Sequence, residues 1–173
     1  MIDPTVSLLV ALAFAALFGS AVMMKLRAPA IFAATLADYR LIPRVFVTAT
    51  GALVIALEGA VALGLVLPAT RATCAVMGAG LLLVYGAGIA INLIRGRREI
   101  DCGCSLRRRP IGRWMVVRNA SLAAALLVCA VPIAERALGI TDAVTICAGL
   151  LVLILLYAAL DLLLGRKPAW EHP

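Results

Sequence analysis

The stretch Thr5–Met24, TVSLLVALAFAALFGSAVMM, contains twenty residues and no charge. An α-helix rises about 1.5 Å per residue, so about 20 helical residues cross the roughly 30 Å hydrocarbon core of a bilayer. Backbone groups in lipid must bond within their own segment, and no two-residue alternation indicates barrel strands. This stretch therefore predicts a transmembrane helix. Because Met1–Pro4 lacks the basic start of a signal peptide, we expect the helix to stay as an anchor.

Four further apolar segments of spanning length follow, at 45–67, 72–94, 114–134 and 143–164. Each of three segments carries one charged residue, namely Glu58, Arg118 and Asp161. The predicted fold class is all-α, a polytopic membrane helical bundle of about five transmembrane helices forming one domain over residues 1–173. Pro29 also favours the start of a short interfacial helix after the first span, with Ile31, Phe32, Leu36 and Tyr39 on one face; an ordinary loop is the alternative.

The composition agrees with a membrane protein and excludes a nucleic-acid partner. Hydrophobic residues make up 64% of the 173 residues, the mean hydropathy is +1.08, and soluble domains are nearer 45–50% apolar. The net charge of +7 would suggest nucleic acid in a soluble protein, but aromatic residues for base stacking are only 5%. The positive charges lie between the apolar segments, where they meet lipid headgroups.

The basic residues predict an orientation in the bilayer. The first and third connections and the C-terminal tail hold Lys25, Arg27, Arg40, Arg44, Arg95, Arg97, Arg98, Arg107, Arg108, Arg109, Arg113, Arg166 and Lys167. The opposite side holds only Arg71 and Arg136. By the positive-inside rule, we expect a bacterial inner-membrane protein with the N-terminus outside and the C-terminus in the cytoplasm.

The sequence Asp101-Cys102-Gly103-Cys104, after the third span, is the sharpest chemical signal. Two thiols separated by one glycine can close a small, strained and relatively oxidising disulfide ring. Neighbouring arginines would stabilise a thiolate, whereas Asp101 acts against it. A redox dithiol, a structural pair and half of a metal site remain open, although zinc favours four ligands and wider spacing, so we predict no metal within this chain.

Three other cysteines lie toward the opposite face in this topology: Cys74, Cys129 and Cys147. They can form a second thiol group that communicates with an outside partner. Alternatively, they are small apolar residues of the core, which is the commoner role of cysteine in such segments.

Glu58 lies in the middle of the second span, where a carboxylate is costly unless it is paired or protonated. We expect Arg118, which precedes Asn119 in the fourth span, to be its partner, either directly or through a water molecule. This pair either fixes the packing or lines a cavity for a quinone, a proton or a peptide. Lys25 and Asn92 lie near the cytoplasmic ends of their helices, where snorkelling or capping explains them.

Several motifs occur together in one order between the apolar spans: Lys25-Leu26, Tyr39-Arg40-Leu41-Ile42-Pro43, Glu58, Asn92-Leu93-Ile94-Arg95-Gly96-Arg97, Asp101-Cys102-Gly103-Cys104 and Arg118-Asn119. From about residue 7 to 130, this arrangement resembles the MauE family of methylamine utilisation membrane proteins, which also look similar to DoxX-type proteins. The family pattern often continues Cys-Gly-Cys with Phe-Gly, whereas Ser105-Leu106 follows here.

The resemblance implies a membrane accessory for maturation, disulfide formation or export of the methylamine dehydrogenase small (beta) subunit, which acts with a thioredoxin-like (MauD-like) protein. Carried over by position, Cys102 and Cys104 would be the redox pair, supported by Glu58, Arg118 and Asn119. That subunit folds outside the cytoplasm, while the charge count places the dithiol inside. Electrons would then cross the bundle through the other cysteines or a quinone, or the dithiol has no direct contact with the substrate.

Two other functions remain open. A non-catalytic membrane scaffold of an exported complex would tolerate changes at both cysteines of the Cys-Gly-Cys unit but not at Glu58. A small-solute transporter would use Glu58 in its pathway, although the sequence has no evident inverted repeat or broken helix pair.

Overall fold

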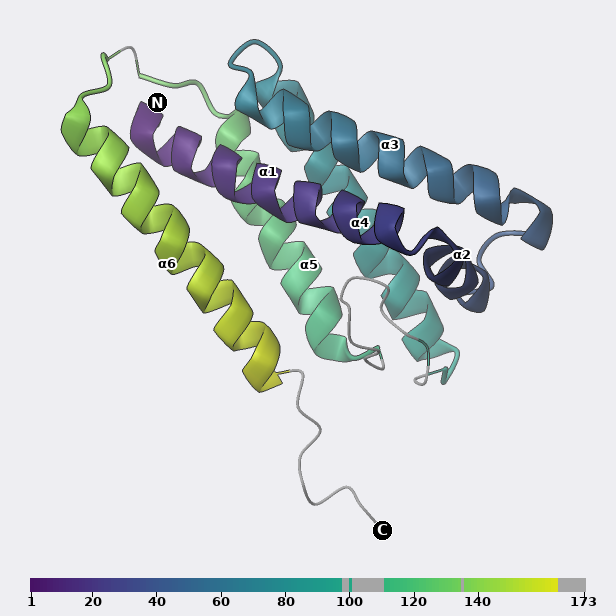
Figure 1. The fold of residues 1–173 in the computed structure, drawn as a ribbon. Coiled ribbons are helices and arrows are strands. Elements are labelled where there is room, and N and C mark those ends of the chain that lie inside the picture. The colour runs from purple at the N-terminus through teal and green to yellow at the C-terminus, as the bar shows by residue number, and fades with distance from the viewer. Residues whose placement is uncertain (98–99, 101–110, 135, 165–173) are drawn as a thin grey trace.

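The computed structural model of the chain describes residues 1–97, 100, 111–134 and 136–164. Over these residues it is entirely helical apart from the connections, which confirms the predicted all-α class (Figure 1). The elements in chain order are α1 (Pro4–Arg27), α2 (Pro29–Asp38), the short 3-10 helix η1 (Arg44–Phe46), α3 (Val47–Val66), α4 (Arg71–Ile94), α5 (Arg113–Leu126), the 3-10 helix η2 (Leu127–Ala130) and α6 (Ile140–Leu164).

Five segments of the described chain are long and apolar enough to cross a membrane, as the sequence predicts. They are Pro4–Arg27, Arg44–Val66, Arg71–Ile94, Arg113–Ala130 and Ile140–Leu160. Spanning helices of this length satisfy their own backbone hydrogen bonds, so their apolar side chains can face lipid directly. The chain is therefore a multi-pass membrane protein.

Helix α1 is longer at its C-terminal end than the uncharged stretch that predicts it. It begins at Pro4, and the Asp3 side chain caps it by accepting a hydrogen bond from the Thr5 N–H at 2.8 Å. It ends at Arg27, just before Ala28 and the proline that opens α2. This extension places Lys25 within the helix rather than in a connection.

The fourth spanning segment is shorter than the predicted range 114–134. Its last turn is the 3-10 helix η2, and Val131 is extended because it precedes Pro132. The Ile2 N–H donates to the Pro132 carbonyl at 3.0 Å, and the Ala134 N–H donates to the Ile2 carbonyl at 2.9 Å. The N-terminus therefore pairs with the chain leaving this segment.

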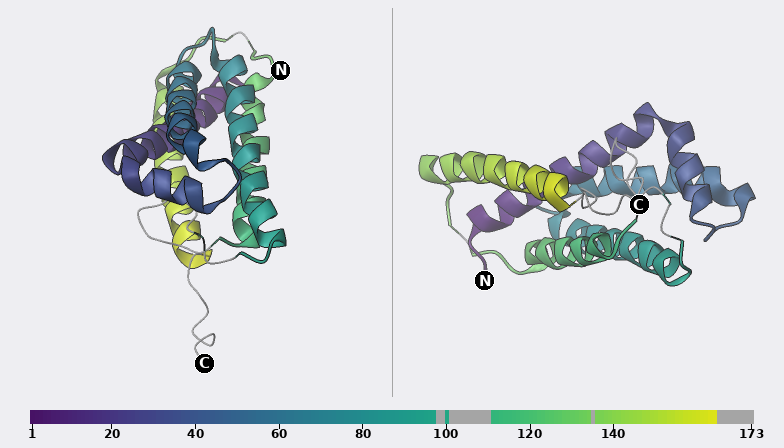
Figure 2. Two further views of the ribbon diagram at one scale, coloured as in Figure 1. Left: turned by 90° about the vertical axis from the view of Figure 1, so that its right-hand side faces the viewer. Right: turned by 90° about the horizontal axis from the view of Figure 1, so that it is seen from below.

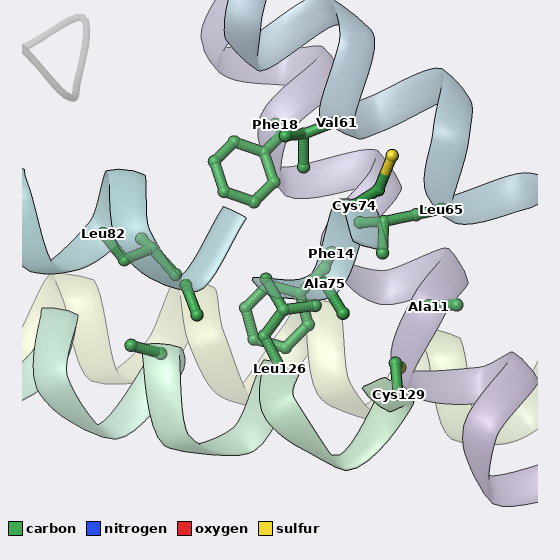
Figure 3. Close-up of a cluster of buried hydrophobic side chains, with 12 residues drawn as sticks. Ala11, Phe14, Phe18, Val61, Leu65, Cys74, Ala75, Leu82, Leu126 and Cys129 are labelled. Atoms are coloured by element: carbon green, nitrogen blue, oxygen red, sulfur yellow. The ribbon is translucent and has the colours of Figure 1, made fainter. Parts of the chain in front are cut away.

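The helices pack in a continuous order in which α5 lies on α4, α4 on α3, α3 on α1 and α1 on α6 (Figures 1 and 2). The core between them gathers side chains from α1, α3, α4 and α5, with Phe14 and Phe18 at its centre (Figure 3). Gly78 of α4 lets this core close, since a Cβ there would lie 2.8 Å from Leu126 and 3.0 Å from Val61.

Helix α6 is attached to the bundle mainly through α1, and Gly149 contacts Leu9 at this interface. Most of its described apolar side chains are exposed, as expected of a helix that faces lipid. We call the end of the bundle with the start of α1 the N-terminal end. The opposite end, which we call the basic end, carries seven of the described basic residues: Lys25, Arg27, Arg40, Arg44, Arg95, Arg97 and Arg113.

The predicted short helix after the first span is α2, which begins at Pro29 as expected. Phe32 and Leu36 both contact the helix α3 backbone at Gly51. Ile31, on the same predicted apolar face, is 59% exposed and does not take part in this contact. Helix α2 therefore covers the basic end of α3 with one narrow face.

Candidate functional site

A polar cluster lies inside the bundle, where α1, α3 and α4 meet. Glu58 of α3 is 1% exposed and Lys25 of α1 is 7% exposed. The Lys25 ammonium donates a hydrogen bond to Glu58 Oε1 and forms an ion pair with it. The Tyr85 hydroxyl of α4 donates to the same oxygen at 2.7 Å. One carboxylate oxygen thus joins three helices, and we call these three residues the Glu58 cluster.

Aromatic rings flank the ammonium of this cluster. Lys25 Nζ lies 5.0 Å from the Phe32 ring centroid and 5.3 Å from the Tyr85 ring centroid, both within the range of cation–π attraction. Phe32 belongs to α2, so this helix also covers the cluster. The ion pair is neutral as a whole, which lowers the cost of keeping both charges away from water.

Lys25 corrects two expectations from the sequence. Among the described residues, the direct hydrogen bonds to Glu58 come from Lys25 and Tyr85, not from the expected Arg118. Lys25 itself does not snorkel, because it points into the bundle on the face of α1 that carries Phe14 and Phe18. These residues lie eleven and seven positions before it, close to whole numbers of helical turns, so their spacing is the signal that could have placed Lys25 correctly.

The predicted pair Arg118 and Asn119 lies on the other side of α4. Asn119 is 2% exposed, and its Cβ would lie 3.5 Å from a Cβ placed on Gly86. Because Gly86 follows Tyr85 in α4, Asn119 and the Glu58 cluster contact α4 at neighbouring heights along its axis. Arg118 is half-buried on α5. No sequence pattern singles out Tyr85, because a tyrosine within an apolar span is common.

The end of α4 is stabilised by a tight capping motif. Gly96 has a φ of +74°, and the N–H groups of Gly96 and Arg97 donate to the carbonyls of Leu93 and Asn92 at 3.1 and 3.0 Å. The Asn92 side chain donates to the Gly88 carbonyl at 3.1 Å and accepts from Arg97 Nη1 at 3.3 Å. The interpretation of Asn92 as a residue that supports a helix end therefore agrees with its contacts.

The segment that follows α4 is held at both of its ends. Ile100 and Ile111 are 7% and 4% exposed and form a cluster with Ile89, which Tyr39 also contacts. The Ile111 N–H donates to the Ile100 carbonyl at 3.0 Å. The intervening Asp101, Cys102 and Cys104 lie outside the described residues. Ile100 and Ile111 themselves lie together at the basic end of the bundle.

The three described cysteines differ in exposure. Cys74 and Cys129 are 9% and 2% exposed in the core (Figure 3), and Cys147 is exposed on α6. The Cys129 thiol donates to the Ser7 carbonyl at 3.5 Å. Cys74 fills the space above Gly64, where a Cβ would lie 2.2 Å from its sulfur. These contacts favour a packing role for both buried thiols.

Within the described residues, no group of three or more His, Cys, Asp or Glu side chains is placed to hold a metal ion. Acidic residues cluster instead around Arg136 at the N-terminal end. Its guanidinium donates to both Asp142 oxygens at 2.7 and 2.8 Å and to Asp3 at 3.1 and 3.2 Å. The hydrogen bond from Arg136 holds the pKa of Asp3 below its ordinary value, and the bonds to Asp142 and Asp3 raise the pKa of Arg136.

Arg136 was noted in the sequence only as a charge. In the structure it ties the N-terminus to the first turn of α6, and the Thr5 hydroxyl adds a bond to Asp142 at 2.9 Å. We call Arg136, Asp3, Asp142 and Thr5 the Arg136 cluster.

Comparisons with known proteins agree on one family. The family profile described as methylamine utilisation protein MauE matches residues 3–132. The chain is 37% identical to the methylamine utilization protein MauE of Methylophilus methylotrophus, over 98% of this chain and 91% of the relative. It is 34% identical to that of Paracoccus denitrificans, over 98% and 92%, and 38% identical to that of Paracoccus versutus, over 92% and 86%. No solved structure matches the chain significantly.

Proposed function

Because this chain belongs to the MauE family of methylamine utilisation proteins, we propose that it is a membrane accessory of the methylamine utilisation system that forms disulfides in an exported partner. The partner is the methylamine dehydrogenase small subunit or a protein like it. A thioredoxin-like protein acts with it, and the Cys102–Cys104 pair is the redox group. Membership of the family supports a role in methylamine utilisation, and the Cys-Gly-Cys motif supports thiol–disulfide exchange as the reaction.

The reaction is a thiol–disulfide exchange in two steps. A thiolate of the partner attacks the Cys102–Cys104 disulfide and forms a mixed disulfide, and the second partner thiolate then releases this chain as a dithiol. Two electrons pass from the partner to Cys102 and Cys104, and two protons accompany them. The oxidised form of the thioredoxin-like protein then accepts those electrons and restores the disulfide. A ring closed over a single glycine favours the first step because strain makes it oxidising.

The observation that carries this proposal is the way the bundle holds the two ends of the dithiol segment. The bond between Ile100 and Ile111 and the burial of both residues fix the segment to α4 and α5. Ile89 of this anchor follows Tyr85 of the Glu58 cluster by four residues, so both lie on one face of α4. The Glu58 cluster therefore supports the anchor by holding α4 against α1 and α3.

The buried cysteines do not support a relay of thiols across the bundle. Cys74 lies at the N-terminal end of α4, and Asn92 lies eighteen residues later at the basic end. At about 1.5 Å per residue, this separation is about 27 Å, far beyond the reach of direct exchange between sulfurs. Exchange with Cys102 and Cys104 therefore takes place at the basic end. The charge count predicts that this end faces the cytoplasm, so we propose that the partner meets the dithiol there before it is exported.

The test is the redox state of the partner in cells that carry cysteine variants. Cys102→Ser and Cys104→Ser should each leave the partner subunit with free thiols, detected by alkylation and mass spectrometry. Cys147→Ser is the matched control, since it removes a thiol exposed on α6 and should leave the partner oxidised. Normal partner disulfides in both test variants would refute the thiol mechanism. If assembly nevertheless failed in Glu58→Leu, the scaffold function would take its place.

A further inference from the structure

One oxygen of the Glu58 carboxylate remains unsatisfied in the structure. Lys25 and Tyr85 both donate to Oε1, whereas Oε2 is buried and has no hydrogen-bond partner among the residues that the structure describes. A carboxylate has about four lone-pair sites, and buried polar atoms in native proteins nearly always find a donor. Since the side chain is 1% exposed, bulk water does not supply this donor. The unsatisfied oxygen points to a bound group.

The charge of the cluster limits what this group can be. The Lys25 ammonium and the Glu58 carboxylate sum to zero, and a second cation would leave one net positive charge inside the membrane, which is costly. The other titratable side chains of the packed elements lie elsewhere. Asp38 and Arg44 are exposed, and Arg71 contacts α3 at Leu65, near the N-terminal end. The group is therefore a neutral hydrogen-bond donor.

The surroundings further define the group. Glu58 lies twelfth among the twenty residues of α3, so the site is at membrane depth. The Phe32 and Tyr85 rings lie beside the Lys25 ammonium, which carries three donor protons. A hydroxyl on an aromatic ring can donate to Oε2 and place its ring beside these side chains. A water molecule can satisfy the same oxygen, because it is also a neutral hydroxyl donor.

We propose that Glu58 Oε2 is the acceptor of a binding site for a neutral hydroxyl group, supplied by a membrane hydroquinone or by a bound water molecule. The site does not require the dithiol, so it can exist even if the thiol mechanism is wrong. The acceptor is Oε2, the Lys25–Glu58 pair keeps the site neutral, and the Phe32 and Tyr85 rings lie beside the ammonium of that pair.

The first experiment uses three matched ligands on the purified full chain in detergent. Decyl hydroquinone has hydroxyl donors, its oxidised quinone has only acceptors, and its dimethyl ether has neither free hydroxyl. Thermal unfolding of the wild-type protein should shift upward by about 5–10 °C with the hydroquinone at a hundredfold excess over its dissociation constant, and much less with the other two. The double variant Lys25→Met/Glu58→Leu is also neutral, and it should lose this shift.

The second experiment detects bound water by radiolytic hydroxyl-radical labelling, which modifies side chains next to ordered water. If water is the donor, Tyr85 and Phe32 should be labelled in the wild-type protein and about tenfold less in the double variant, whose site is apolar. A hydroquinone-specific thermal shift identifies the hydroquinone, and labelling without such a shift identifies water. Equal stabilisation by the dimethyl ether, or neither a shift nor labelling, would overturn the proposal without any reference to the cysteines.

Discussion

The close approach of α3 and α4 at Gly64 gives the most direct test of the fold. In the structure, a Cβ on Gly64 would lie 2.2 Å from Cys74 Sγ and 3.3 Å from Cys74 Cβ. Nonbonded atoms of this size are comfortable at about 3.5–4.0 Å. Gly64→Ala therefore requires the helices to separate by more than about 1 Å, or Cys74 to leave its position in the core.

The expected cost of Gly64→Ala follows from this overlap. Overpacking a close-packed interior costs about 1–3 kcal/mol, and alanine returns up to about 1 kcal/mol through its higher helix propensity. The net loss is up to about 3 kcal/mol. At roughly 2–4 °C per kcal/mol for a chain of this size, the temperature of thermal unfolding should fall by up to about 12 °C. Adding Cys74→Ala removes the sulfur and should recover most of the loss, since the remaining contact at 3.3 Å is only slightly tight.

The assay is thermal unfolding of the purified protein in one detergent, measured for each single variant and for the double variant. Gly59→Ala is the matched control, because it lies on the same helix and a Cβ there meets nothing within 4 Å. Its stability should be unchanged or slightly higher. If Gly64→Ala proved as stable as Gly59→Ala, the packing of α3 on α4 described above would be wrong.

Three further predictions concern the polar clusters and the thiols. Lys25→Met leaves Glu58 as an unpaired buried charge and should destabilise the protein by about 3–5 kcal/mol, measured by unfolding in detergent. The double variant Lys25→Met/Glu58→Leu removes both charges and should recover most of that loss. Equal losses in the two variants would refute the ion pair. Because Arg136 lowers the pKa of Asp3, their interaction stabilises the folded state above the ordinary Asp value of 3.8 and is lost as the pH falls through the lowered value. The stability difference between wild type and Arg136→Gln should therefore shrink in acid, and a difference that stays constant below pH 4 would contradict this account. A membrane-soluble maleimide should label Cys147 in the folded protein, while the two buried described thiols should react only after unfolding; early labelling of those two would place them outside the core.

The sequence predicted the membrane class and all five spans because each span is an apolar run of sufficient length with at most one charged residue. The wrong predictions concern polar residues whose partners lie on another helix. Its position near the end of the first span favours snorkelling or capping for Lys25, whereas helix α1 continues to Arg27 and carries the Lys25 side chain into the bundle. The partner of Glu58 could not be derived from periodicity, since periodicity identifies a face but not the neighbouring helix.

The termination of the fourth span shows a second limit of sequence reasoning. Hydropathy extends the apolar run to 134, but Pro132 makes Val131 extended, and Ile2 pairs with this strand-like segment. This pairing joins residues more than a hundred positions apart, which no local pattern can predict. The Arg136 cluster could not be predicted for the same reason, because its two aspartates, Asp3 and Asp142, lie far apart in the sequence.

The joined ends at Ile100 and Ile111 also bear on how this family can diversify. When the two ends of an insert are fixed to each other by a buried pair and a backbone bond, its length and composition can change without transmitting strain to the supporting helices. Residues 101–110 can then vary among relatives while the transmembrane helices keep their packing. Grafting residues 101–110 from a relative should leave the melting temperature of the bundle nearly unchanged.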